Sequence, residues 1–144
     1  MNWRFTISAI VIFVALFLLG WLVHGGLLGA DYERIRPLLR SPDETRGRIL
    51  YVFAAQLCTA FALVWIYSRG REERPWLGQG VRYGLAVALL ATIPTNLIQY
   101  AAMPIPLDFM LKRMCYDVAA VVLLSIVVAW INRGAASGQR DPGR

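Results

Sequence analysis

The organisation of this chain is clearest in residues 81–117, VRYGLAVALLATIPTNLIQYAAMPIPLDFMLKRMCYD. A long apolar run is interrupted by Pro94 and ends at the Pro104-Ile105-Pro106 segment, after which a second apolar run begins with Asp117 inside it. Long apolar runs that are separated by proline indicate two consecutive helices in an apolar environment. The rest of the chain repeats this pattern.

Composition extends that conclusion to the whole chain. Of 144 residues, 58% are hydrophobic and 17% are charged, and the charges cluster between apolar runs at about residues 5–23, 49–67, 81–103 and 114–132. Each run has roughly 19 to 23 residues, and about 20 helical residues span a bilayer core. A soluble bundle would need polar faces along these runs, which lack them. We therefore predict an all-α, four-transmembrane-helix bundle in an integral membrane protein.

The predicted domain covers residues 1–133. Its helices are expected at about 5–28, 42–68, 76–103 and 106–133. Residues 134–144, GAASGQRDPGR, form a polar tail that we expect to be disordered. The first run is too long for the apolar region of a signal peptide, so it is interpreted as a retained helix.

The net charge of +6 does not indicate nucleic acid as a partner. The basic residues lie beside apolar runs, where they set topology and meet lipid headgroups, so the predicted partner is the lipid bilayer. Four crossings place both termini on one side, with eight basic residues there and seven on the other. The acidic residues of the other side favour cytoplasmic termini in a bacterial inner (cytoplasmic) membrane, with the protein as a multi-pass component.

The connection at residues 31–48 has its own helical signals. Tyr32, Ile35, Leu38 and Leu39 recur at helical spacing, which predicts a short interfacial amphipathic helix despite Pro37. The alternative is a solvated connection whose arginines and acids neutralise each other. Within the segment 41–44, Ser, Pro, Asp and Glu form a helix-start pattern with serine as the N-cap, so the second long helix is expected to begin near residue 42.

The third helix carries a strip of small residues and a proline. The strip comprises Gly80, Gly84, Ala88 and Thr92 at steps of four, which lets another helix approach closely. We interpret it as packing inside the bundle, with a dimer face as the alternative. Pro94 removes a backbone hydrogen bond and is expected to kink the helix.

Polar side chains gather in the leaflet away from the termini. The predicted cluster comprises His24, Gln56, Asn96, Gln99, Tyr100 and Asp117. By helical rise Gln56 and Asn96 lie ~10 Å inside the helix ends and Asp117 ~6 Å below Arg113. Two interpretations remain open: hydrogen bonds between helices, with Asp117 paired to Arg113 or His24, or a shallow polar pocket that admits a solute, a proton or a lipid headgroup.

Motifs for catalysis, metal binding or nucleotide binding are not recognisable in the sequence. Cys58 and Cys115 have no metal-ligand spacing, and a single histidine near Asp117 is weak evidence for acid–base chemistry. We therefore expect no catalytic residues, no metal and no cofactor.

Four segments carry a family resemblance: HGGLLGADY from residue 24, ILYVFAAQ from 49, TNLIQYAAMPIP from 95 and KRMCYDVAAVVLLSIVVAWINR from 112. Over about residues 20–133 the chain resembles uncharacterised small four-helix inner-membrane proteins of bacteria that carry only a domain-of-unknown-function label. The resemblance implies a four-helix membrane fold and assigns no functional residue.

The functional expectation is a non-enzymatic structural or accessory membrane protein, as a homo-oligomer or a subunit of a larger membrane complex. The alternative is a small-solute, ion or lipid transporter or channel that acts as an oligomer through the polar pocket.

Overall fold

The structure, a computed structural model, describes residues 3–70, 72 and 75–133. Four helical segments are long and apolar enough to cross a membrane: Trp3–Leu27, Ile49–Arg69, Trp76–Ala102 and Leu107–Asn132. This confirms the all-α fold class with four packed transmembrane helices. The predicted disordered tail, residues 134–144, lies outside the described residues.

The spans are divided into shorter elements by local changes in helix type. In chain order these are α1 (Trp3–Gly20), the π-helical η1 (Trp21–Leu27), α2 (Gly29–Arg34), the 3₁₀-helical η2 (Arg36–Leu38), α3 (Pro42–Arg46), α4 (Ile49–Arg69), α5 (Trp76–Val87), the π-helical η3 (Ala88–Thr92), α6 (Ile93–Ala102) and α7 (Leu107–Asn132).

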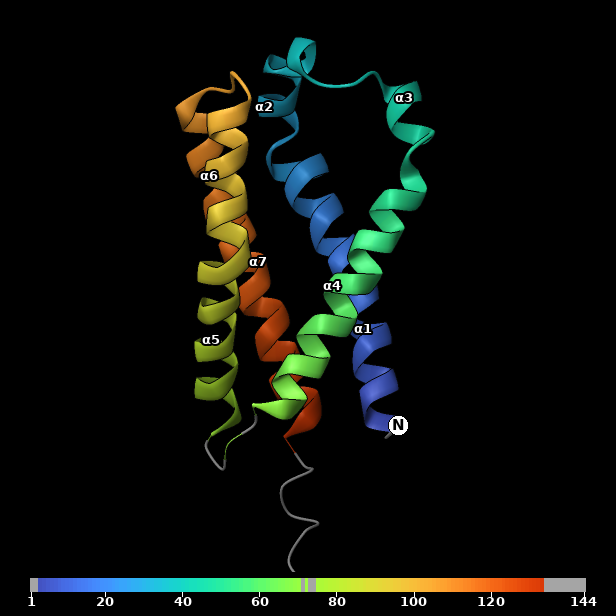
Figure 1. Ribbon diagram of the computed structural model, residues 1–144, viewed down its shortest axis with the longest axis vertical. Coiled ribbons are helices and arrows are strands. Elements are labelled where there is room, and N and C mark those ends of the chain that lie inside the picture. The colour runs from blue at the N-terminus through green and yellow to red at the C-terminus, as the bar shows by residue number, and fades with distance from the viewer. Residues whose placement is uncertain (1–2, 71, 73–74, 134–144) are drawn as a thin grey trace, which may run out of the picture.

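The bundle consists of two groups of helices that diverge (Figure 1). One group contains α5, α6 and α7, and the other contains α1 and α4; α1 also packs against α7. We call the end that carries Trp3 and Arg133 the terminal end, and the end that carries the connection through α2 and α3 the loop end. The two groups are close at the terminal end, and α4 leans away from α6 towards the loop end (Figure 1).

Small residues bring α5 directly against α7. A methyl group at Gly84 would lie 2.7 Å from the Cα of Val122, and one at Gly80 would lie 2.9 Å from the Cα of Ile126. Ala88 is also buried, and Thr92 is partly buried. The strip of small residues therefore faces α7 of the same chain, where it permits backbone contact.

Two tyrosines attach α4 to α5 at the terminal end. The hydroxyl of Tyr83 donates a hydrogen bond of 2.7 Å to the carbonyl oxygen of Leu63, and the hydroxyl of Tyr67 donates one of 3.1 Å to Oε1 of Gln79. The two tyrosine rings meet edge to face at 5.5 Å. These contacts hold α4 to α5 in the half of the bundle nearer the terminal end.

The disturbance that Pro94 causes is a π-helical turn ahead of it. Pro94 is the second residue of α6, where a missing N–H is tolerated, and η3 occupies the turn before it. The carbonyl oxygen of Thr92 accepts a hydrogen bond of 3.0 Å from the Asn96 amide. In the first span, likewise, the two glycines after His24 do not end the helix, which continues in π form to Leu27.

The second long helix differs from the expected continuous helix at 42–68. It is split into α3 and α4, because Gly47 and Arg48 leave the regular helix and Arg48 has φ −111° and ψ 12°. Glycine lowers helix stability through backbone entropy, which allows the break at this point. The expected helix start is present: Ser41 Oγ accepts from the Glu44 amide at 3.3 Å, and Glu44 Oε2 accepts from the Ser41 amide at 3.2 Å.

Replacing Ser41 with alanine is expected to loosen α3. Loss of an N-cap hydroxyl costs about 1 kcal/mol, which is roughly a fivefold increase in the open population of this short helix. Hydrogen exchange of a peptide covering residues 42–48 measures the change. Ser68→Ala is the control, since that hydroxyl donates to the Trp65 carbonyl at the other end of α4. Equal exchange in the two variants would contradict a stabilising role for the capping box.

The loop-end connection packs only through its first half. Ile35 is buried in a cluster with Ile105, Phe109 and Met110. The predicted amphipathic helix is short, because α2 ends at Arg34, and Leu38 and Leu39 of the expected apolar face are exposed.

The charges of this connection are neutralised in two ways. Arg36 pairs locally with Glu33 at 3.0 Å, and Arg46 with Asp43 at 3.4 Å. Two further pairs reach α7: Arg34 to Asp108 at 2.7 Å and Lys112 to Asp31 at 3.2 Å. The expected self-neutralisation is therefore partial, and α2 is tied to the start of α7.

Candidate functional site

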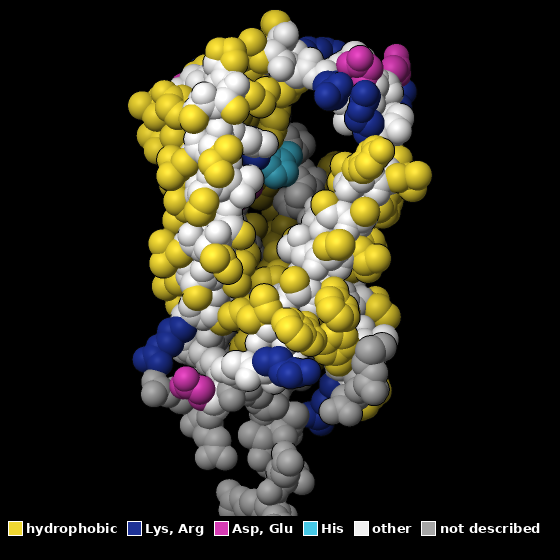
Figure 2. Space-filling model, in the orientation of Figure 1, with side chains coloured by type: hydrophobic (Ala, Val, Ile, Leu, Met, Phe, Trp, Pro, Cys, Tyr) yellow, Lys and Arg dark blue, Asp and Glu magenta, His cyan; other side chains and the backbone are white. Residues whose placement is uncertain are grey.

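A cavity of about 360 Å³ lies between the diverging helices in the loop-end half of the bundle. All four membrane spans contribute to its lining. In the space-filling view a hollow opens sideways between α4 and α6, beneath the connection that holds α2 and α3, and the histidine side chain is visible inside it (Figure 2). The cavity is therefore open towards the region that lipid occupies.

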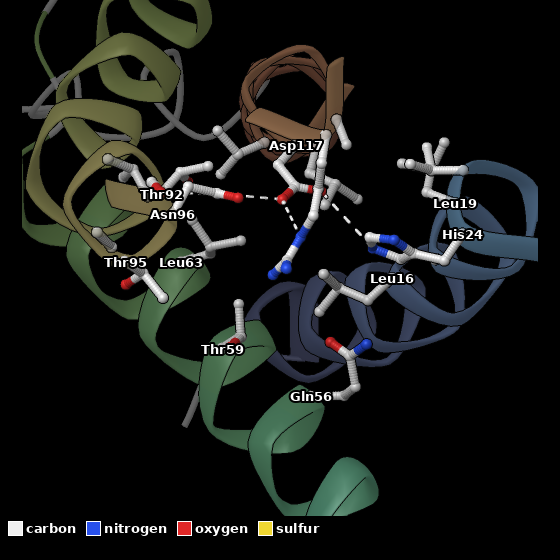
Figure 3. Close-up of a pocket in the computed structure, with 18 residues that line it drawn as sticks. Leu16, Leu19, His24, Gln56, Thr59, Leu63, Thr92, Thr95, Asn96 and Asp117 are labelled. Carbon is white, nitrogen blue, oxygen red and sulfur yellow. Dashed lines mark hydrogen bonds and ion pairs between the residues drawn. The ribbon is translucent and has the colours of Figure 1, made fainter. Parts of the chain in front are cut away.

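Asp117 is the centre of the polar side chains in this cavity (Figure 3). Its Oδ2 accepts a hydrogen bond of 3.2 Å from the Asn96 amide and lies 3.5 Å from Nε of Arg113, one helical turn earlier in α7. Its Oδ1 lies 3.6 Å from Nε2 of His24. One carboxylate thus joins the first, third and fourth membrane spans.

His24 is oriented by a second contact outside the membrane span. Its Nδ1 lies 3.0 Å from the hydroxyl of Tyr32, whose ring packs edge to face on Phe109. Burial raises the pKa of the Tyr32 phenol above its ordinary value, so the hydroxyl remains protonated and can donate to Nδ1. The tautomer that satisfies both contacts carries its proton on Nε2, facing Asp117.

Arg113 brings hydrogen-bond donors to the cavity that the protein itself does not use. Its Nε is buried without a hydrogen-bond partner, and across the described part of the chain the guanidinium donates no hydrogen bond. Among the described residues, the acidic side chain that pairs with it is Asp117. Arginine is a multiple donor, so its remaining N–H groups are available to a ligand.

The lining changes from polar to apolar along the helix axis. On α7, Arg113 and Asp117 lie ~9 Å and ~15 Å from the start of the helix, whereas Leu124 lies ~26 Å from it. The apolar part of the lining comprises Leu16, Leu19, Val23, Leu63, Val87, Ala91, Ala120, Val121 and Leu124. The cavity is therefore amphipathic, with its polar part nearer the loop end.

The structure brings together most of the side chains that the sequence indicated. His24, Gln56, Asn96 and Asp117 line the cavity. Gln99 and Tyr100 do not contribute to this lining. Both belong to the last turn of α6, nearer the loop end than Asn96, and Tyr100 is exposed.

Four polar residues of the lining were not part of the predicted cluster. Arg113 is a predicted partner of Asp117 from its i, i+4 spacing, but the predicted cluster does not include it as a lining residue. Thr92 was assigned to the strip of small residues, and Thr59 and Thr95 carried no signal of their own. The site contains both a hydrogen bond between helices, from Asn96 to Asp117, and a cavity beside it.

The donor set of the described residues does not assemble a metal site. Groups of three or more histidine, cysteine, aspartate or glutamate side chains close enough for a metal ion do not occur among them. Cys58 and Cys115 are free and exposed, and neither lines the cavity. The chemistry available in the cavity is hydrogen bonding and charge pairing.

Comparison with protein-family models, curated proteins and solved structures finds no match for this chain. The resemblance to small four-helix inner-membrane proteins is therefore not supported by an identified family or homologue. What stands is the four long apolar helices, and with them a small multi-pass membrane protein.

Proposed function

We propose that this protein is a non-enzymatic membrane protein that binds a lipid-like amphiphile with a neutral or zwitterionic headgroup in the loop-end cavity. Binding of this kind is the recognition step of a small transporter or carrier. The observation that carries the proposal is the sideways opening between α4 and α6 onto a polar cavity (Figure 2). A ligand dissolved in the bilayer can enter by that route.

The amphipathic lining supports an amphiphile over a fully polar solute. A headgroup at the level of Asp117 and Asn96 meets charged and amide groups. An attached acyl chain extends past Leu63 and Leu124 towards the bundle centre. Pockets for small molecules are mainly apolar with a few convergent polar groups, as this lining is.

The charge balance supports a neutral or zwitterionic headgroup. Arg113 is opposed by Asp117, and His24 is held in contact with the same carboxylate. A strongly anionic group would have to approach this carboxylate, and a cation would have to approach the guanidinium. A zwitterion matches both, with its anionic part at Arg113.

The proposal places the protein in the cytoplasmic membrane of a bacterium with the terminal end in the cytoplasm. The positive-inside rule counts basic residues in short loops, and the terminal side has eight against seven. Ion pairs neutralise Arg34, Arg36, Arg46 and Lys112 at the loop end, which supports this orientation.

A second candidate is an accessory subunit of a larger membrane assembly, or a homo-oligomer. It is favoured by the position of α4, which packs mainly on α1 and leaves the side between α4 and α6 open (Figure 2). A helix of a partner seated between α4 and α6 would fill the cavity. In that case its polar side chains would serve helix association.

Cysteine accessibility separates these possibilities. In a background with Cys58→Ala and Cys115→Ala, Gln56→Cys and Asn96→Cys are treated with a membrane-impermeant charged thiol reagent in vesicles. We expect both variants to react, because both positions line the cavity, and Asn96→Cys to react more slowly, because Asn96 is 4% exposed. The matched controls are Leu57→Cys and Leu97→Cys, which neighbour them at similar depth on exposed apolar faces. These positions should not react, since they face lipid.

The headgroup is tested by protection of the same thiols. Vesicles that contain a zwitterionic phospholipid should slow the labelling of Gln56→Cys relative to vesicles of anionic lipid alone. Labelling with no protection by either lipid would overturn the amphiphile and leave a water-filled site. An unreactive Gln56→Cys that instead crosslinks to a second protein would support the accessory subunit.

A further inference from the structure

A second groove lies at the terminal end, on the outside of the bundle between α1 and α7. It has a volume of about 510 Å³. Its floor is apolar, with Ile7 and Val11 from α1 and Val127 and Ile131 from α7. These four side chains form a strip along the helix axis that suits an extended hydrocarbon chain.

Two arginines and two tryptophans stand at the outer end of this floor. Arg4 and Trp3 come from the first turn of α1, and Arg133 and Trp130 come from the end of α7. The guanidinium carbon of Arg133 lies 5.1 Å from the centre of the Trp130 ring. Tryptophan is enriched at the membrane interface, so the arginines lie at headgroup level.

The charges of this groove are not neutralised by the part of the chain that the structure describes. Within that part, neither Arg4 nor Arg133 forms an ion pair or a side-chain hydrogen bond with an acidic residue. The loop-end cavity is different, because there Asp117 opposes Arg113. Two unopposed arginines beside an apolar floor are complementary to an anion that carries an acyl chain.

The groove has a fixed width because α1 and α7 are joined behind it. The amide of Asn132 donates a hydrogen bond of 3.2 Å to Oγ of Ser8, and Ser8 is fully buried. Ile12 and Val128 belong to the main core on the inner side of the same helices. Arg4 and Arg133 are thereby held on neighbouring helix ends before a ligand arrives.

We propose that this groove binds one anionic membrane phospholipid, with its phosphate between Arg4 and Arg133 and an acyl chain on the apolar floor. The tryptophan rings border the headgroup at the interface. The site is in the opposite leaflet from the loop-end cavity and does not depend on the function proposed for that cavity. Its lipid is an anionic structural ligand, whereas the cavity is charge-balanced.

Native mass spectrometry of the full chain, released from detergent and titrated with phosphatidylglycerol, tests the site. We expect the wild-type protein to retain one phosphatidylglycerol in preference to phosphatidylcholine. The double variant Arg4→Gln/Arg133→Gln should bind it roughly twenty-five-fold more weakly, because each arginine near an anionic headgroup contributes a factor of about five. Val11→Trp keeps both charges and obstructs the floor, and it should also lose the lipid.

The matched control is Arg69→Gln/Arg82→Gln, which removes two charges from the same end of the bundle. Arg69 also stacks on a tryptophan, with its guanidinium carbon 5.4 Å from the Trp65 ring centre, but it does not line the groove. This variant should retain the phosphatidylglycerol. Equal loss in the two double variants would reduce the effect to general surface charge and overturn the site. A dimer that persists without bound phosphatidylglycerol would overturn it as well, by assigning the groove to a second copy.

Discussion

Gly84→Ala is expected to destabilise the bundle by about 2 kcal/mol. The added methyl group would lie 2.7 Å from the Cα of Val122 and 3.1 Å from the Cβ of Ser125. Overpacking of a tight interface costs about 1–3 kcal/mol, and a backbone atom cannot move aside as a flexible side chain can. The helices α5 and α7 must therefore separate. Unfolding by denaturing detergent in mixed micelles measures the free energy.

Gly78→Ala is the matched control for this substitution. Gly78 lies in the same helix, and a methyl group there would meet nothing within 4 Å. Alanine is favoured over glycine in a helix by up to about 1 kcal/mol, so this variant should be neutral or more stable. If both variants were equally stable, direct backbone contact between α5 and α7 would be ruled out as the reason for the small residues.

Asp117→Leu is expected to cost about 3 kcal/mol and to remove binding in the loop-end cavity. The substitution leaves the Arg113 guanidinium without an opposing charge inside a membrane span and takes a hydrogen-bond acceptor from Asn96. Removing one partner of a buried pair costs about 3–5 kcal/mol, and Asp117 is 20% exposed, which places the effect at the lower end. Detergent unfolding and the thiol protection described above provide the two measurements.

The double variant Arg113→Met/Asp117→Leu distinguishes the charge from the packing. Replacing both charges with apolar groups of similar size is often neutral, so the double variant should recover most of the stability but not the binding. Asp108→Asn provides a second comparison, since its pair with Arg34 is exposed to solvent and should contribute much less to stability than the pair inside the cavity. A double variant no more stable than Asp117→Leu alone would refute the unopposed charge as the cause.

Hydropathy and length were sufficient for the architecture. Without water, a spanning segment must satisfy its own backbone hydrogen bonds, so an apolar run of about 20 residues has few structures other than a helix. The expected helix at 76–103 corresponds to Trp76–Ala102, and the expected helix at 106–133 corresponds to Leu107–Asn132. Proline and the clustered charges marked those ends.

Local backbone form was harder to predict. The π-helical turns η1 and η3 lie inside continuous apolar runs, so the apolar pattern does not mark them. The break at Gly47 lies where the chain has left the apolar segment, so nothing in hydropathy marks it. The strip from Gly80 to Ala88, in contrast, was visible because small residues recurred at one spacing.

The candidate site was predictable in depth but not in direction around each helix. Counting residues at 1.5 Å placed His24, Asn96 and Asp117 in one leaflet, and these three are in contact. The same count included Gln99 and Tyr100, which lie outside the cavity. Which side of α6 faces α7 is decided by packing between helices. Depth alone contains no information on that rotation.

The tyrosine contacts between α4 and α5 have a mechanical consequence. The hydrogen bond from Tyr83 fixes the position of α4 at Leu63, while the part of α4 between Leu63 and Ile49 leans away from α6 (Figure 1). Ile49 lies ~21 Å from Leu63 along the axis of α4, so a tilt of α4 by about 5° about Leu63 displaces Ile49 by about 2 Å. Small rotations of α4 about Leu63, at the inner end of the cavity, therefore change the width of the sideways opening near Ile49.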